Sequence, residues 1–149
     1  MRLRNMMAKA GVVAAAAGSV LALQAPAQAA ANPYSPQAAC GSGYYVIDSA
    51  PLRNSSHGTG GRVYLLYKNG RNCVATIKNV AVGRSTYTKA VLNVFQPTGG
   101  ISHYNDFASY KYYANVSAYA GGRCVSASGY TYDRSGNFYS GSISKGHCG

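Results

Sequence analysis

Short runs of strand-forming residues, interrupted by glycine-containing turns, follow one another along most of the chain. The turns recur about every ten residues, and no window shows sustained helical periodicity. The 149 residues include 14 Tyr and 18 Gly but no Glu, which excludes a long helical bundle with many ion pairs. This pattern predicts an all-β fold, which is either a small antiparallel β-sandwich or a barrel. Strand order would distinguish the two, and the periodicity of the sequence does not reveal it.

The N-terminal residues have the composition of a secretory signal peptide. Arg2, Arg4 and Lys9 form a positive region, residues 11–23 are apolar, and Ala-x-Ala cleavage sequences follow. The apolar run is too short to span a bilayer, and no second one follows. Removal of the peptide lowers the formal charge from +11 to +8. The predicted organisation is a signal peptide at 1–29, with cleavage between 27 and 31, a polar arm at 30–39 and a single β domain at 40–149.

The β domain divides into strands and loops that can be placed from the pattern alone. Strands are predicted at 44–48, 62–67, 72–78, 86–95, 110–119, 123–133 and 137–144. Residues 53–61 and 101–107 are predicted to be loops. No helix is expected.

Four Cys in a small exported domain imply two disulfides. If the last hairpin turns at Ser135-Gly136, the numbers of facing residues add to about 271. Cys124 then lies opposite His147, one residue from Cys148, and we predict a disulfide between these two Cys.

The second disulfide, Cys40–Cys73, follows by elimination. Asn69-Gly70 is the strongest short hairpin signal in the chain, and its register places Cys73 opposite Leu66. The Cys73 face of this hairpin is otherwise apolar, so this disulfide would tie the N-terminal end of the domain to a core face.

Residue types that enzymes use for acid–base, nucleophilic or metal chemistry are few. The acids and histidines are Asp48, Asp106, Asp133, His57, His103 and His147. No His stands at a metal-ligand spacing, no Cys remains unpaired, and there is no Gly-x-Ser-x-Gly sequence. His103 and Asp106 are interpreted as a polar turn. We predict no catalytic residue, no metal site and no cofactor.

Basic and aromatic side chains are the remaining candidates for function. The predicted binding surface consists of Tyr110, Lys111, Tyr112, Tyr113, Lys68 and Arg71. Tyrosine can stack on sugars or bases, and Lys and Arg can hold anions. Tyrosine is also a favoured strand residue, so the same residues are compatible with a purely structural role. No specific nucleic-acid partner is predicted.

Four sequence segments carry a family resemblance. They are CGSGYYVIDS at 40–49, GRVYLLY at 61–67, GRNCVATI at 70–77 and the terminal HCG. Across 40–149 the chain resembles the spore-associated protein A family of streptomycetes and related actinobacteria. The resemblance implies an exported protein found with spores and aerial growth, and it supplies no catalytic residues.

The expected function is that of an exported, non-enzymatic protein of the spore or cell surface, structural or adhesive. Its partners would be spore or cell-wall polymers, and it would span no membrane after signal cleavage. The alternative is a secreted binding module for polysaccharide or another anionic wall polymer. A protease inhibitor is disfavoured because Cys73 and Cys124 lie in strands rather than loops, and a small hydrolase is disfavoured by the missing Glu.

Overall fold

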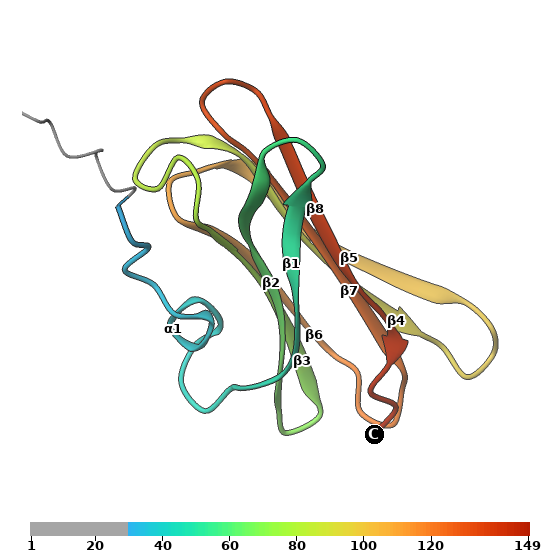
Figure 1. Ribbon diagram of the computed structural model, residues 1–149. Coiled ribbons are helices and arrows are strands. Elements are labelled where there is room, and N and C mark those ends of the chain that lie inside the picture. The colour runs from blue at the N-terminus through green and yellow to red at the C-terminus, as the bar shows by residue number, and fades with distance from the viewer. Residues whose placement is uncertain (1–29) are drawn as a thin grey trace, which may run out of the picture.

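The computed structural model describes residues 30–149, so the predicted signal peptide lies outside the described residues (Figure 1). One short helix is followed by eight strands. These are α1 (Pro36–Cys40), β1 (Tyr45–Asn54), β2 (Gly58–Lys68), β3 (Arg71–Lys78), β4 (Thr86–Phe95), β5 (Ile101–Tyr110), β6 (Tyr113–Tyr119), β7 (Val125–Tyr132) and β8 (Phe138–Gly146). The all-β prediction is confirmed.

The eight strands form one antiparallel sheet in the order β5-β4-β7-β8-β1-β2-β3-β6. The sheet bends round so that its two edge strands, β5 and β6, approach each other, and the fold is a nearly closed barrel. Alternate residues of β4 and β7 point inward, as a strand with one buried face requires. Leu65, Val74, Leu92 and Val125 are fully buried in this core.

The two disulfides join Cys40 to Cys73 and Cys124 to Cys148, the pairs that the sequence predicts. In the last hairpin Tyr132 faces Phe138 and Ala127 faces Ile143, so the numbers of facing residues add to 270, one less than predicted. An irregularity between Val125 and Ala127 raises this number to 271 at the pair Val125–Gly146 and so moves Cys148 one position nearer to Cys124.

The Asn69-Gly70 hairpin also has its predicted register, with Leu66 opposite Cys73. Both turn residues have positive φ, 47° and 78°, as a two-residue turn of this type needs.

Two predicted loops are mostly strand. β1 continues to Asn54 and β2 begins at Gly58, so only Ser55, Ser56 and His57 remain between them. The region 101–107 belongs to β5, which pairs with β4 along its whole length. β5 is an edge strand with polar, largely exposed residues, and a strand without a buried face lacks the apolar alternation that would identify it.

The predicted polar arm contains most of a short helix, although no helix is predicted from the sequence. The Ser35 hydroxyl accepts a hydrogen bond from the backbone N–H of Ala38, and Pro36 occupies the first turn. Cys40 ends the helix and its disulfide holds it on β3. The helix is too short to be stable alone, so this disulfide and the burial of Ala39 fix it.

The helix covers the outer face of β2 and β3. A second apolar cluster lies there, outside the barrel, and consists of Ala39, Leu66, Cys73, Ala75 and Ile77. One outer face of the sheet is thereby converted into a core. No helix among residues 30–149 is long and apolar enough to cross a membrane.

Candidate binding surfaces

The structure separates the six residues predicted to form one binding surface. Tyr113 pairs with Ile77 at one end of β3, whereas Arg71 pairs with Tyr119 at the other end. Six residues of strand separate these positions, about 20 Å. Lys68 lies beside Arg71, in the β2–β3 hairpin. The structure therefore does not bring the six residues together, because residues 110–113 lie at one end of β3 and Lys68 and Arg71 lie at the other.

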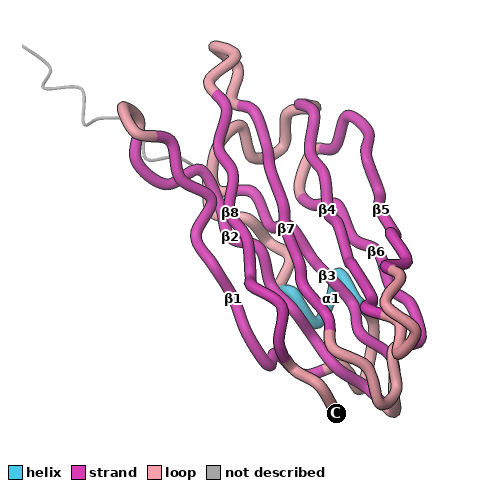
Figure 2. The backbone as a smooth tube through the Cα atoms, turned by 90° about the vertical axis from the view of Figure 1, so that its right-hand side faces the viewer, coloured by secondary structure: helices cyan, strands magenta, loops and turns pink. Residues whose placement is uncertain are grey.

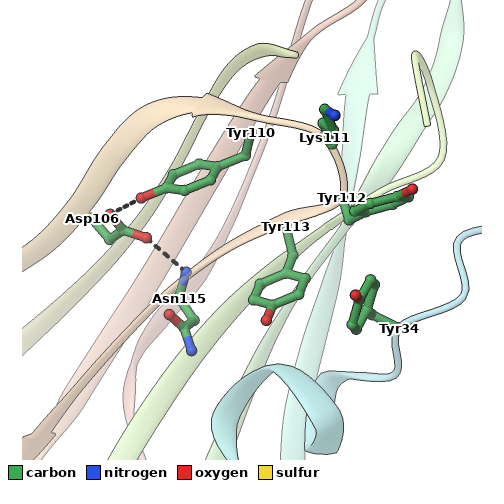
Figure 3. A pocket seen from close by; sticks show the side chains of 7 residues that line it. All are labelled: Tyr34, Asp106, Tyr110, Lys111, Tyr112, Tyr113 and Asn115. Atoms are coloured by element: carbon green, nitrogen blue, oxygen red, sulfur yellow. Dashed lines mark hydrogen bonds between the residues drawn. The ribbon is translucent and has the colours of Figure 1, made fainter. Parts of the chain in front are cut away.

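Residues 110–113 connect β5 to β6, and we call them the β5–β6 corner (Figure 3). Together with Tyr34, Asp106 and Asn115 they line a shallow pocket. Tyr34 packs against Tyr112 and Tyr113, with ring centroids 5.2 and 5.1 Å away, whereas Lys111 points away from these rings. The arm thus covers much of the ring surface that a ligand would need.

Asp106 links the two edge strands at this corner. Its Oδ2 accepts a hydrogen bond from the backbone N–H of Asn115 on β6 at 3.1 Å, and its Oδ1 accepts from the Tyr110 hydroxyl at 2.5 Å. The hydrogen bond to Asp106 raises the pKa of Tyr110 to about 12. This carboxylate satisfies an edge N–H that no ladder partner reaches, so its role is structural.

A fully buried lysine, Lys78, lies next to the β5–β6 corner. The Lys78 ammonium donates to the carbonyl oxygens of Arg84 and Tyr110, both at 2.8 Å, and to the Thr86 hydroxyl at 2.7 Å. Burial lowers the pKa of Lys78 from 10.5 to about 8. The Asn32 side chain adds bonds to the carbonyl oxygens of Lys78 and Tyr112. Lys78 lies at the end of a predicted strand, and nothing in the sequence marks it as buried.

The other two predicted residues also make local contacts. Lys68 donates to the carbonyl oxygen of Ser42 at 2.7 Å and lies 5.9 Å from the centre of the Tyr44 ring. Arg71 reaches the Ser117 hydroxyl at 3.4 Å. Both are placed where they tie neighbouring segments together, and neither lies near the β5–β6 corner.

A different aromatic surface lies on the outer face of β5, β4, β7 and β8. It consists of Tyr87, Phe107, Tyr130, Tyr132 and Phe138, and we call it the aromatic strip. Neighbouring rings have centroids 5.2 to 6.0 Å apart, within the range of aromatic contacts. Tyr87, Phe107 and Phe138 are 57%, 49% and 42% exposed. This surface was not predicted from the sequence, because its members come from four strands.

Cationic side chains lie in the same part of the sheet. Lys89 on β4 pairs with Phe107 on β5 and with Tyr130 on β7. Tyr130 in turn pairs with Ser140 on β8, and Ser140 pairs with Arg53 on β1. These five residues form one row across five strands, which we call the Lys89 row. Two aromatic and two cationic residues thus share one line on the barrel surface.

The residues considered for catalysis do not come together. His103 is exposed and bonded to Asn93, on the opposite face of β5 from Asp106, so the interpretation as a polar turn is wrong. His147 contacts Asp48 at 2.9 Å, and this hydrogen bond lowers the pKa of Asp48. Within residues 30–149 no group of three potential metal ligands was found.

All three carboxylates have internal partners. Asp133 accepts hydrogen bonds in the β7–β8 turn from Ser135, Asn137 and Tyr139, which lowers its pKa. Asp48 and Asp106 are bonded as described above. The only ion pair among residues 30–149 is His147 with Asp48, so no Lys or Arg there has a carboxylate partner.

Comparison with known proteins identifies a relative that covers most of the chain. No family model and no solved structure matches the chain. The chain is 37% identical over 116 residues to spore-associated protein A of Streptomyces coelicolor, an alignment that covers 74% of this chain and 70% of that protein. With this identity and coverage, together with the segments noted in the sequence, the chain belongs to the spore-associated protein A family.

Proposed function

We propose that this protein is exported and adheres to the spore or cell surface, where it acts as a structural or adhesive component without catalysis. The observation that carries the proposal is the distribution of charge. Each Asp side chain of residues 30–149 accepts a hydrogen bond within the protein, no Lys or Arg side chain there has an acidic partner, and of these cations only Lys78 is buried. Such a surface attracts polyanions from a distance.

Two further observations support this proposal. The relative is named for its association with spores, and two disulfides suit a protein that works outside the cell. The absence of catalysis is supported by the positions of the described histidines, each of which is exposed and bonded singly to Asn54, Asn93 or Asp48.

The test is retention of the secreted protein on streptomycete spores and on purified cell walls. The full chain is expressed with its own N-terminal segment, and the medium is assayed for a processed product without free thiols. We expect retention at low salt and release near 1 M salt, where the screening length falls to about 3 Å. Recovery of all protein inside the cell, or no retention at low salt, would contradict the proposal.

A charge variant and a reaction assay complete the test. Replacing Arg84, Lys111 and Arg134 together by Gln removes three exposed positive charges that have no acidic partner, and we expect weaker retention with unchanged unfolding. Wall material incubated with the protein should release no soluble fragments. Steady release of fragments by the wild type would show an enzyme and refute this part of the proposal.

A further inference from the structure

We infer that the outer face of β5, β4, β7 and β8 binds an anionic polysaccharide. In this arrangement the aromatic strip stacks on sugar rings, and Lys89 and Arg53 contact acidic groups of the chain. The inference rests on the proposed function and deepens it, because it assigns a ligand class and a binding face to a general electrostatic attraction.

This face is the uncovered counterpart of the one beneath α1. Figure 2 views the molecule from the side of β8, β7, β4 and β5, and α1 lies on the far side. Over β2 and β3 the outward apolar residues are covered by the helix and the Cys40–Cys73 disulfide. Over the four other strands the rings remain in solvent, with Tyr87 more than half exposed. Contiguous exposed aromatic surface of this kind marks an interaction site.

The geometry of the strip suits a chain of sugar rings. A pyranose ring has an apolar face of C–H groups and a rim of hydroxyls, so it packs flat on an aromatic side chain while its rim bonds to neighbouring polar groups. The strip crosses four adjacent strands, a width of about 14 Å. Hydroxyl and amide side chains surround it, and the outward ones include Asn93, Asn105, Ser128, Ser140 and Ser142. Both parts of a sugar therefore find matching groups.

The charge of this face selects an acidic polymer. Lys89 lies between Phe107 and Tyr130 in the Lys89 row, and its ammonium is 5.9 Å from the Phe107 ring centre. Arg53 ends the same row and is exposed. Neither has a carboxylate partner among the described residues. A polymer with both sugar rings and acidic groups satisfies the strip and the cations together.

The same charges argue against a second copy of this chain as the occupant. A symmetric dimer brings the same patch of both subunits together. Lys89 and Arg53 of each copy would then lie against a face with the same two cations and no carboxylate, and this repulsion opposes association. An acidic glycan encounters no such penalty.

The experiment measures binding to polygalacturonate, which has carboxylated pyranose rings, by affinity electrophoresis of the secreted protein. Dextran provides sugar rings without charge, polyphosphate provides charge without rings, and oligothymidylate provides an anion with bases. Tyr87→Ala is compared with Tyr45→Ala, since these tyrosines are 57% and 56% exposed and only Tyr87 belongs to the strip. Lys89→Gln is compared with Lys111→Gln in the same way. Thermal unfolding of each variant verifies that it folds.

We expect polygalacturonate to bind best. Tyr87→Ala should weaken binding on the order of tenfold, because loss of a stacked ring removes a contact of that strength. Lys89→Gln should weaken binding and reduce its salt dependence, whereas Tyr45→Ala and Lys111→Gln should bind like the wild type.

Three results would overturn the inference. They are equal losses in Tyr87→Ala and Tyr45→Ala, stronger binding of polyphosphate or oligothymidylate than of polygalacturonate, and a concentration-dependent dimer that Tyr87→Ala dissociates. The outcomes also separate the two proposals. Spore retention that Tyr87→Ala does not change refutes the binding face and leaves surface adhesion standing. If the wild type is not retained on spores but binds polygalacturonate in a way that depends on Tyr87, surface adhesion is refuted and the binding face remains supported.

Discussion

Lys78 gives the sharpest test of the interior, because its side chain is completely buried and its ammonium has no carboxylate partner. The ammonium instead donates three hydrogen bonds to oxygen atoms of Arg84, Thr86 and Tyr110. These bonds connect the end of β3 to the start of β4 and the end of β5. The variant Lys78→Met keeps the length of the side chain and removes both the charge and the donors.

The pKa of Lys78 determines how stability changes with pH. Burial lowers this pKa in the folded state from 10.5 to about 8, so the unfolded chain holds the proton more tightly. The charged Lys78 therefore lowers the free energy of unfolding most below about pH 8, and this free energy rises as the pH increases from 8 to 10.5. The difference in pKa corresponds to about 3 kcal/mol at neutral pH, most of which is recovered by pH 10.

The assay is urea unfolding of the wild type and of Lys78→Met at about pH 7, 8.5 and 10. Tyrosine ionisation affects both proteins and cancels in the comparison. At neutral pH the variant no longer has the unfavourable buried charge, but it leaves three hydrogen-bond acceptors unpaired, each of which costs about 1–3 kcal/mol if buried. These two effects oppose each other, so the test is the change of stability with pH and not the difference in stability at one pH. We expect the wild type to gain about 2 kcal/mol more than the variant between the lowest and highest pH.

Lys111→Met is the control, because Lys111 is exposed and lies in the same corner. It should follow the pH dependence of the wild type. Parallel stability curves for the wild type and Lys78→Met would refute the argument, since they would mean that Lys78 has the same pKa in the folded and unfolded chain.

Three further predictions concern the disulfide at the helix, the barrel seam and the packing of the core. Replacing Cys40 and Cys73 together by Ser should lower the free energy of unfolding by about 4 kcal/mol, because the disulfide joins residues 33 positions apart in the sequence. Urea titration measures this free energy, and an unchanged value would contradict the prediction. Asp106→Asn should destabilise the seam by about 1–2 kcal/mol and bring the pKa of Tyr110 down from about 12, which an ultraviolet titration would detect; an unchanged titration would exclude the proposed bond. Gly129→Ala should cost about 1–3 kcal/mol in a thermal melt, since its Cβ would lie 2.2 Å from a buried threonine hydroxyl, and a wild-type melt would disprove this close packing.

The local parts of the fold could be predicted because they depend on local geometry. Asn69-Gly70 determines the register of its hairpin through the positive φ of both residues, and that register correctly places Leu66 opposite Cys73. The pairing of Cys124 with Cys148 was predicted from the same kind of reasoning about Ser135-Gly136, although the register of that hairpin is one residue off the predicted one and an irregularity at Val125 compensates for the difference.

Strands whose sequence depends on distant partners were missed. Gly60 belongs to β2, and a Cβ there would lie 2.4 Å from the Tyr139 ring, so this position needs Gly for packing rather than for a turn. The sequence shows only a glycine in a polar stretch, which predicts a loop. β5 was missed for a related reason, because among residues 30–149 it pairs with β4 alone and has little buried surface.

The candidate site required the strand order, which the sequence does not contain. The aromatic strip depends on β4 lying between β5 and β7, and β4 and β7 are not consecutive in the chain. The burial of Lys78 also depends on the arrangement of the strands. Its neighbours in the sequence do not mark it as buried, and its partners Arg84 and Tyr110 come from other parts of the chain.

The three Asp residues make stabilising contacts away from the cations of the proposed binding face. Asp133 organises a turn, Asp106 joins the edge strands, and Asp48 contacts His147 beside the C-terminal disulfide. None of them lies beside Lys89 or Arg53, although a carboxylate there would reduce the local repulsion. Because no ion pair is broken when either cation is replaced, such a change should cost little stability. A loss of ligand binding in these variants would therefore report on the ligand contact itself and not on the fold.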